Sequence, residues 1–315
     1  MANPRQPVTR QPARSLDPAA ILARAPSLAG APRQVTPLPG GLTNQNFKVT
    51  TPDGVYVARL FSDGGELLCI DREREYRNSL IAASAGVGAP VIEYRPADRL
   101  LVLGFIEGRT LTSADVAQPA TLARIADVCA TLHGADRFAG DFDMFEVQAA
   151  YRMTVRRHGL ALPAGYDELG PAFSAARDAL VVRAEGTVPC NNDLLAANFI
   201  DDGSRIWIID YEYSGNNDPC FELGNIAGEC GLDADALAAL VTAYYRRPRR
   251  SRIARAKLFN LVSRYGWTLW GAIQHGTSEL DFDFWSWAME RFEVAAAGFT
   301  SPAFGRLLDD VQCED

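Results

Sequence analysis

Residues 188–213 read VPCNNDLLAANFIDDGSRIWIIDYEY, and this stretch decides the predicted fold. Asp193 precedes Asn198 by five residues, and a predicted strand that starts near Ile206 runs into Asp210. Phosphoryl transfer requires a carboxylate beside the attacking hydroxyl group and oxygen ligands that hold Mg²⁺ on the nucleotide phosphates. The stretch supplies these groups in the order in which kinases carry them. It therefore predicts a phosphotransferase.

The acids and amides of this stretch have separate expected roles. Asp193 is expected to orient the substrate hydroxyl group and to accept its proton. Asn198 and Asp210 are expected to hold Mg²⁺, with Glu212 as a further ligand that binds directly or through water. The alternative is a pair of Asx turns that flank a hairpin, because Asn and Asp are common turn residues. The complete ordered set favours the kinase interpretation over that alternative.

A nucleotide-binding element is expected nearer the N-terminus. Gly40 and Gly41 lead into Thr43, Asn44 and Asn46, where a glycine turn runs into a predicted strand. Glycine allows backbone amides to approach phosphate groups closely. A double glycine before a strand also fits a plain hairpin turn, which is the alternative for this segment. A Walker-type loop is excluded, because it needs a lysine directly after glycine and neither lysine of the chain has that neighbour.

Arg59 lies in a predicted strand, at the place where protein kinases use a lysine to grip the phosphates. Its permanent charge and its fork of donors suit phosphate at least as well. Glu75, by preference over Glu73, is predicted to fix Arg59 through an ion pair. The alternative is a solvated face of alternating arginine and glutamate over residues 72–75.

The pattern along the chain predicts an α+β fold with two lobes. Helical patterns dominate from Ser113 onward, apart from a strand-rich segment over residues 187–213. The elements predicted before that point are a capped helix over 18–24, a glycine turn and strand over 38–50, a second strand over 55–61 that completes an antiparallel hairpin, an amphipathic helix over 71–85, and strands over 91–94 and 100–105.

These elements predict three segments. Residues 1–14 are rich in Pro, Arg and Gln and read as a disordered tail. Residues 15–106 are predicted to form a small N-terminal nucleotide-binding lobe with an antiparallel sheet. Residues 107–315 are predicted to form a larger, mainly helical lobe for catalysis and substrate binding.

Composition narrows the expected partners. The 315 residues carry a formal net charge of -8, which disfavours nucleic acid and anionic membranes as partners. No uninterrupted apolar run reaches the roughly 18 residues of a membrane span. The six cysteines are scattered and form no zinc-binding pattern, so reduced thiols in a cytoplasm are expected. The oligomeric state stays open.

With these motifs in place, the chain resembles the choline/ethanolamine kinase group within the wider aminoglycoside phosphotransferase-like superfamily. The resemblance extends over roughly residues 38–299. The segments that carry it are residues 40–44, 72–76, 105–108, 209–213, 217–219 and 266–270.

The resemblance implies a bilobal kinase-like fold that binds ATP between the lobes with Mg²⁺, and it places Phe105 and Ile106 near the adenine. It also implies a small cationic alcohol, choline or ethanolamine, beside Asp193. A methylated ammonium has no N–H to donate, so aromatic faces and diffuse negative charge hold it best. The residues that match the positions for this cation are Tyr213, Glu229, Trp267 and Trp270. Core packing is the alternative for the two tryptophans.

The chain departs from the family pattern at two positions. Asn191 stands where the family usually has a histidine that supports the loop and the magnesium aspartate. Asparagine can donate one such hydrogen bond, so activity is expected to survive. Glu222 stands where many members have aspartate, in another support role. The arginine-rich run over residues 246–252 is expected to be a solvated connector, and structural roles are expected for His133, His158 and His275.

Two other functions stay in view. An antibiotic or other hydroxyl-substrate kinase of the same superfamily shares the magnesium apparatus, but polyamine sugars call for many carboxylates rather than paired tryptophans. A pseudokinase that senses a nucleotide or cation gains support from Asn191. The four intact site residues argue against it: Asp193, Asn198, Asp210 and Glu212. The choice between choline and ethanolamine stays open, because such discrimination depends on only about 1–3 kcal/mol.

Overall fold

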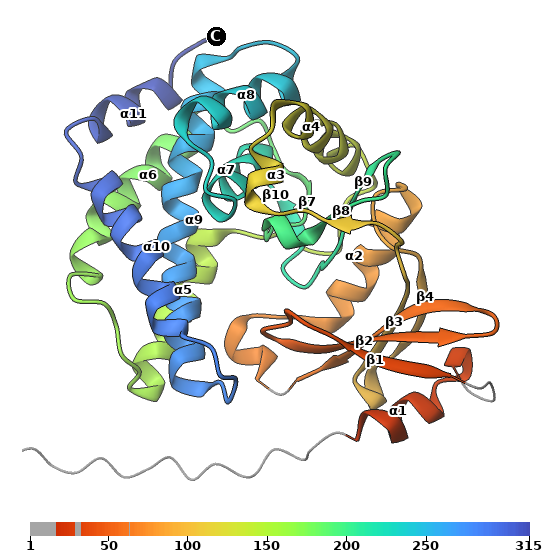
Figure 1. The fold of residues 1–315 in the computed structure, drawn as a ribbon. Coiled ribbons are helices and arrows are strands. Elements are labelled where there is room, and N and C mark those ends of the chain that lie inside the picture. Colours follow the sequence, from red (N-terminus) through yellow and green to blue (C-terminus); the bar gives the residue numbers. More distant parts are fainter. Residues whose placement is uncertain (1–16, 29–32, 63) are drawn as a thin grey trace, which may run out of the picture. The chain divides into compact units, whose positions relative to one another are not determined.

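The computed structural model describes residues 17–28, 33–62 and 64–315 (Figure 1). The predicted disordered tail over residues 1–14 lies outside the described residues. The chain divides into two compact units. The described residues up to Gly64, together with Ile92–Leu103, form the first unit, and Gly65–Val91 with Gly104–Asp315 form the second. The lobe boundary at residues 106 and 107 remains a prediction.

The first unit is built on a five-stranded sheet with the order β1-β2-β3-β5-β4. Its strands are β1 (Gln34–Leu38), β2 (Asn44–Thr51), β3 (Gly54–Phe61), β4 (Val91–Arg95) and β5 (Leu100–Gly104). The predicted hairpin of β2 and β3 is confirmed, with Asn46 opposite Arg59. The sequence did not indicate β1, because most of its side chains are exposed and no apolar alternation marks it.

A small apolar core stabilises this unit. Helix α1 (Pro18–Arg24) begins where predicted, and the Asp17 side chain accepts a hydrogen bond from the Ala19 backbone N–H. Ile21 and Leu22 of α1 are buried in one cluster with side chains of the sheet, among them Leu60. The helix therefore packs on the sheet through its apolar side chains.

The second unit is mainly helical, as predicted. Its helices are α2 (Arg72–Ser84), α3 (Ser113–Val116), α4 (Pro119–His133), α5 (Met144–His158), α6 (Gly170–Val182), α7 (Pro219–Glu229), α8 (Ala234–Tyr245), α9 (Arg250–Thr277), α10 (Phe284–Phe299) and α11 (Phe304–Val311). The longest is α9, which packs against α5, α7, α8, α10 and α11 (Figure 1). Among the described residues, no helix combines the length and apolar character that a membrane crossing requires.

Helix α7 approaches α9 very closely at Gly224. A Cβ atom at this position would overlap the Ala256 carbonyl oxygen and lie 2.9 Å from the Asn260 backbone nitrogen. Only glycine allows this backbone approach. The contact fixes α7, and with it the two acidic side chains Glu222 and Glu229, against the central helix.

The predicted strand-rich segment contains β7 (Val188–Cys190), β8 (Phe199–Asp201) and β9 (Ile206–Ile208). Two further short strands, β6 (Arg109–Thr110) and β10 (Gly215–Asn217), complete its sheets by pairing with β8 and β7. The sequence did not indicate β6 and β10, because strands of two or three residues are too short for an alternating pattern.

The arginine-rich run over residues 246–252 joins α8 to α9 and enters the first turn of α9. Arg246 is exposed and pairs with Asp127 at 2.6 Å. Arg252 is buried and pairs with Glu185. The expected connector is thus confirmed, although its last arginine is not solvated.

Candidate active site

The loop between β7 and β8 carries Asp193 and Asn198. The Asn198 side-chain amide donates a hydrogen bond to the Asp193 backbone carbonyl oxygen at 2.8 Å. The Leu194 backbone N–H donates to Asn225 Oδ1 of α7 at 3.0 Å. These bonds fix both ends of the loop, so its acid and its amide keep a constant separation.

Asn191 connects this loop to the segment after β9. Its Oδ1 accepts a hydrogen bond from the Asp193 backbone N–H at 3.1 Å, and its Nδ2 donates to the Asp210 carbonyl oxygen at 2.7 Å. Asp210 has a positive φ of 65°, so the chain leaves the strand geometry and turns at this residue. The support expected from the residue at position 191 is therefore confirmed, and a neutral amide provides it.

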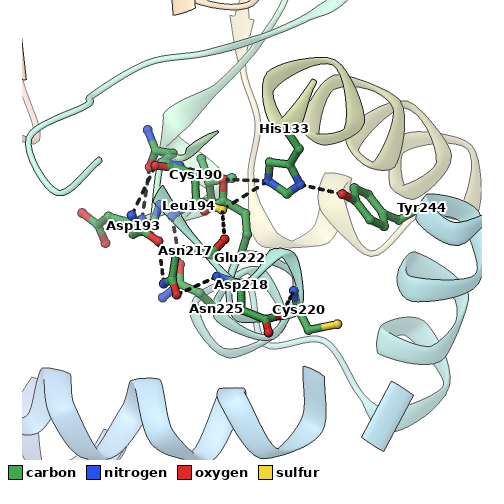
Figure 2. Close-up of polar contacts among 12 residues, drawn as sticks. His133, Cys190, Asp193, Leu194, Asn217, Asp218, Cys220, Glu222, Asn225 and Tyr244 are labelled. Carbon is green, nitrogen blue, oxygen red and sulfur yellow. Dashed lines mark hydrogen bonds and ion pairs between the residues drawn. The ribbon is translucent and has the colours of Figure 1, made fainter. Parts of the chain in front are cut away.

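Glu222 supports the same loop from α7 (Figure 2). Its two carboxylate oxygens accept hydrogen bonds from the backbone N–H groups of Asn191 at 2.8 Å and Asn192 at 2.6 Å. His133 Nε2 lies 3.6 Å from Glu222 Oε1, and His133 Nδ1 lies 2.8 Å from the Tyr244 hydroxyl oxygen. The support role considered for Glu222 is confirmed, and His133 belongs to that support.

A buried His133–Cys190–Glu222 cluster brings its ligand atoms within 4.8 Å of one another. The three side chains of this cluster already have partners within the protein (Figure 2). Cys190 Sγ, for example, also lies 3.7 Å from the Asn217 carbonyl oxygen. The cluster offers one carboxylate together with a thiol sulfur and an imidazole nitrogen. This set does not suit Mg²⁺, because Mg²⁺ prefers oxygen ligands. It is therefore a support for the loop rather than the magnesium site.

Asp193 lies among other acids. Burial, followed by the negative charges of Glu229, Asp210 and Glu212, raises the pKa of Asp193 well above its usual value, while the positive charge of Arg291 opposes this rise. A carboxyl group with a raised pKa is a stronger base when it is ionised. The same crowding of negative charge favours a bound cation.

The side chains expected to hold Mg²⁺ differ in the hydrogen bonds and ion pairs that they already form within the protein. Asn198 uses its NH₂ group on the Asp193 carbonyl oxygen, so its Oδ1 is the atom available as a ligand. Glu212 Oε2 accepts a hydrogen bond from Arg72 Nη1 at 3.0 Å. Carboxylate and amide oxygens are the ligands that Mg²⁺ prefers, so the set fits the ion. The ion pair of Glu212 favours its contribution through water.

Arg72 was not singled out from the sequence. It binds Glu75 Oε2 at 2.7 Å as well as Glu212, and Glu75 is fully enclosed. The alternative of a solvated face over residues 72–75 is therefore wrong for Glu75, although Glu73 does pair with Arg77 at the surface. The predicted ion pair of Glu75 with Arg59 would join the two units and remains a prediction.

The sequence-predicted phosphate-binding turn lies in the first unit, between β1 and β2. Gly40 has a positive φ of 100°, and a Cβ atom at Gly41 would overlap the Asn44 carbonyl oxygen. The backbone of the turn therefore requires glycine at both positions, at Gly40 for its positive φ and at Gly41 for the close approach. The Asn44 side-chain amide donates to Thr43 Oγ1 at 3.1 Å, which orders the residues that follow the glycines.

Arg59 of β3 is buried, and its Nε donates to Asn46 Oδ1 at 3.3 Å. The structure therefore brings the candidate residues of β2 and β3 together beside the glycine turn. Phe105 and Ile106 follow directly after β5, in the second unit, and both are half-buried. Their place near an adenine ring remains a prediction.

The aromatic residues predicted to hold a cation lie together in the second unit. The rings of Tyr213 and Trp267 are 4.9 Å apart and meet edge to face. Trp270 Nε1 donates to the Tyr213 hydroxyl oxygen at 2.7 Å. Trp287 of α10 extends the group, with its ring 5.0 Å from that of Trp270. The sequence did not single out Trp287, because it lies in no motif and joins the others only through the packing of α10 on α9.

Glu229, at the end of α7, forms a buried ion pair with Arg291 of α10. Arg291 Nε lies 3.3 Å from Glu229 Oε1, and Arg291 Nη2 contacts Glu229 Oε2. The Arg291 guanidinium carbon lies 3.3 Å from the ring centroid of Trp287. Sequence reasoning assigned Glu229 to the cation but missed Arg291, since no motif connects residues on separate helices.

Comparisons with known proteins agree with this geometry. The choline/ethanolamine kinase family profile matches residues 35–246. A choline/ethanolamine kinase family protein from Mesorhizobium loti is 32% identical, with a TM-score of 0.81, over 93% of this chain and 97% of that one. Choline kinase LicA from Streptococcus pneumoniae is 25% identical, with a TM-score of 0.73, over 84% of this chain and 93% of that one. Ethanolamine kinase 2 from Mus musculus is 27% identical over 75% of this chain and 68% of its own length.

The wider fold relationship is also confirmed. A thermostable mutant of an aminoglycoside phosphotransferase matches 85% of this chain and 95% of its own, with a TM-score of 0.58 and 18% identity. At that identity the likeness concerns the fold alone. The predicted α+β, kinase-like architecture is therefore confirmed, with a sheet-based unit and a larger helical one.

Proposed function

The chain belongs to the choline/ethanolamine kinase family, and from that premise we propose that it transfers the γ-phosphate of ATP to the hydroxyl group of choline or ethanolamine. One contact supports this assignment above the others. The amide of Asn191 connects the backbone of Asp193 to that of Asp210, so the expected base and the expected magnesium ligand are held in a fixed relation. A site that had lost catalysis would not need this connection.

Asp193 is the proposed base. As the acceptor hydroxyl oxygen forms a bond to the γ-phosphorus, the bond between that phosphorus and the β–γ bridging oxygen breaks, and ADP leaves with that oxygen. The hydroxyl proton passes to the Asp193 carboxylate and then to solvent. The raised pKa of Asp193 suits this role, because a carboxylate of higher pKa accepts the proton more readily.

Asn198 and Asp210 are the proposed ligands of Mg²⁺, with Glu212 contributing through water while Arg72 engages it. When bound, Mg²⁺ supplies positive charge to the nucleotide phosphates and lowers the cost of the charge that develops there. Asn191 keeps Asp210 in place, and the hydrogen bond from Asn198 to the Asp193 carbonyl oxygen keeps the amide oxygen directed away from the loop backbone.

The nucleotide is proposed to bind the glycine turn and the residues near it. Backbone N–H groups of the turn suit phosphate, and Arg59 supplies a permanent positive charge. The proposed nucleotide-binding residues are Gly40, Gly41, Thr43, Asn44, Asn46, Arg59, Glu75, Phe105 and Ile106.

The acceptor is proposed to bind the aromatic group of the second unit. Trp267 and Trp270 lie one helical turn apart on α9, and Tyr213 bridges them through its ring and its hydroxyl group. Aromatic faces attract a cationic head group that has lost its water.

All six cysteines are free thiols, which suits a reducing compartment such as the cytoplasm.

The test is ADP release by the purified protein with Mg-ATP and one acceptor at a time: choline, ethanolamine, thiamine or an aminoglycoside. We expect turnover with choline or ethanolamine. The variant Asp193→Asn should lower kcat by about 10²- to 10⁴-fold, the usual contribution of a general base. Turnover with the aminoglycoside alone, or full activity of the variant, would contradict the proposed function.

A further inference from the structure

The acid of the proposed acceptor site is already engaged in an ion pair within the protein. Glu229 and Arg291 bury almost all of their side-chain surface, with 4% and 9% exposed respectively. Both carboxylate oxygens of Glu229 accept from the Arg291 guanidinium group. Both oxygens that an N–H donor on a ligand would need are therefore already occupied by Arg291.

Arg291 also connects this acid to the aromatic group. Its guanidinium carbon lies 3.3 Å from the ring centroid of Trp287, and its Nη1 lies 3.3 Å from the Trp287 carbonyl oxygen. The Trp287 ring in turn lies 5.0 Å from that of Trp270. The guanidinium group is therefore fixed on three sides, and Glu229 cannot turn toward an acceptor without leaving it.

The other polar atoms of the aromatic group offer little to an N–H donor. The Tyr213 hydroxyl oxygen already accepts a hydrogen bond from Trp270 Nε1 at 2.7 Å. Trp267 Nε1 is buried and has no hydrogen-bond partner among the described residues, but it is itself a donor. The group thus combines aromatic faces with acceptors that already have donors.

The two family acceptors differ in what they require from such a site. The primary ammonium of ethanolamine has three N–H donors and loses strong hydration on binding, so it needs acceptors in return. The quaternary ammonium of choline donates no hydrogen bond and is held by aromatic faces. We propose that Arg291, by engaging Glu229, is a specificity-determining residue that makes this site select methylated ammonium alcohols over primary ones. This inference rests on the proposed function.

The first measurement is kcat/KM of the unaltered protein for choline and for ethanolamine at saturating Mg-ATP. We expect choline to exceed ethanolamine by about 10- to 200-fold, the range over which an apolar pocket discriminates between small groups. N-methyl and N,N-dimethyl ethanolamine should fall between the two, in the order of their methyl groups.

The second measurement uses a matched pair of variants. Arg291→Met keeps the apolar stem and removes the charge, which leaves Glu229 without its ion-pair partner and with both carboxylate oxygens released from the guanidinium group. The choline-to-ethanolamine ratio should then fall by about tenfold or more, because the free carboxylate favours the N–H donor. The double variant Arg291→Met with Glu229→Gln loses the same packing but has no free charge, so it should keep a ratio near that of the unaltered protein.

The ratio separates specificity from general damage, since misfolding lowers kcat/KM for both acceptors alike. Arg177→Met, which breaks an exposed ion pair with Glu146, serves as a control and should leave the ratio unchanged. If Arg291→Met does not fold, the double variant still tests the inference, because it buries no unpaired charge.

Three outcomes would overturn the inference: a preference for ethanolamine in the unaltered protein, an unchanged ratio in Arg291→Met, or a lost preference in the double variant. Each leaves the kinase activity itself intact. Absence of turnover with every amino alcohol would instead contradict the proposed function, so the two failures are distinguishable.

Discussion

Both polar atoms of the Asn191 side chain form hydrogen bonds within the site. Its oxygen accepts from the Asp193 backbone and its nitrogen donates to the Asp210 carbonyl oxygen, in a fully enclosed position. An imidazole could donate to the same carbonyl oxygen, but its charge changes near pH 6.5, whereas an amide does not titrate. The support that Asn191 provides is therefore independent of pH.

We expect Asn191→Ala to lower kcat by about 10- to 100-fold, because its side chain makes three hydrogen bonds, to Asp193, Ile209 and Asp210, and each freed partner costs roughly 1–3 kcal/mol. Asn191→His should retain most of the activity, since it restores the donor toward Asp210. The measurement is kcat at saturating Mg-ATP and acceptor, with circular dichroism to confirm folding. Equal activity of Asn191→Ala and the unaltered protein would refute the role.

The raised pKa of Asp193 predicts the pH dependence of the reaction. A base must be ionised to accept a proton, and a raised pKa means that Asp193 is protonated at higher pH than an ordinary aspartate, whose pKa is about 3.9. The rate should therefore decrease as pH falls, with a midpoint above that value. Glu229→Gln removes a negative neighbour, so its midpoint should lie at lower pH. The measurement is the pH profile of kcat for both proteins, and a midpoint that does not move would count against the electrostatic coupling.

At the scale of elements, the packing of α7 on α9 determines where the acids of the site lie. Helix α7 carries Glu222 under the catalytic loop and Glu229 beside the aromatic group, seven residues or two helical turns later. A shift of this one helix would displace the support of Asp193 and the partner of Arg291 together.

Gly224→Ala should therefore destabilise the protein by about 1–3 kcal/mol, the usual effect of inserting a methyl group into a packed contact. The added Cβ atom would overlap the Ala256 carbonyl oxygen of α9. Gly170→Ala is the matched control, because Gly170 has helical backbone angles and open space around it. That control should be neutral or stabilise by up to about 1 kcal/mol. Urea unfolding measures both, and similar stabilities of the two variants would contradict the close approach.

At the scale of the whole molecule, local signals predicted α1, α2, the first hairpin and the helical character of the chain from Ser113 onward. Roles could be proposed for Asp193, Asn198 and Asp210 because those roles depend on spacing within a short stretch of chain. The α+β layout followed from the order of strands and helices along the chain, and the kinase-like architecture followed from the resemblance to the family.

The remainder could not be read from the sequence because it arises when distant segments pack. Arg291 meets Glu229 across 62 residues, and Arg72 meets Glu212 across 140. Neither contact has a pattern in the chain, and a charged residue on a helix reads as solvated until its neighbours are known. Strand β1 exists through its pairing with β2 rather than through an alternation of its own.

The ion pair between Arg72 and Glu212 has a thermodynamic consequence. At the proposed metal site, a cation that bound Glu212 directly would compete with Arg72 for its carboxylate, so the affinity for that cation would contain the free energy of loosening the arginine. By reciprocity, a bound cation weakens the ion pair between Arg72 and Glu212 by the same free energy by which that ion pair weakens the binding of the cation. Arg72 is the first residue of α2, and it also pairs with Glu75 of the same helix, so loosening its contact with Glu212 would release the start of α2 from this segment.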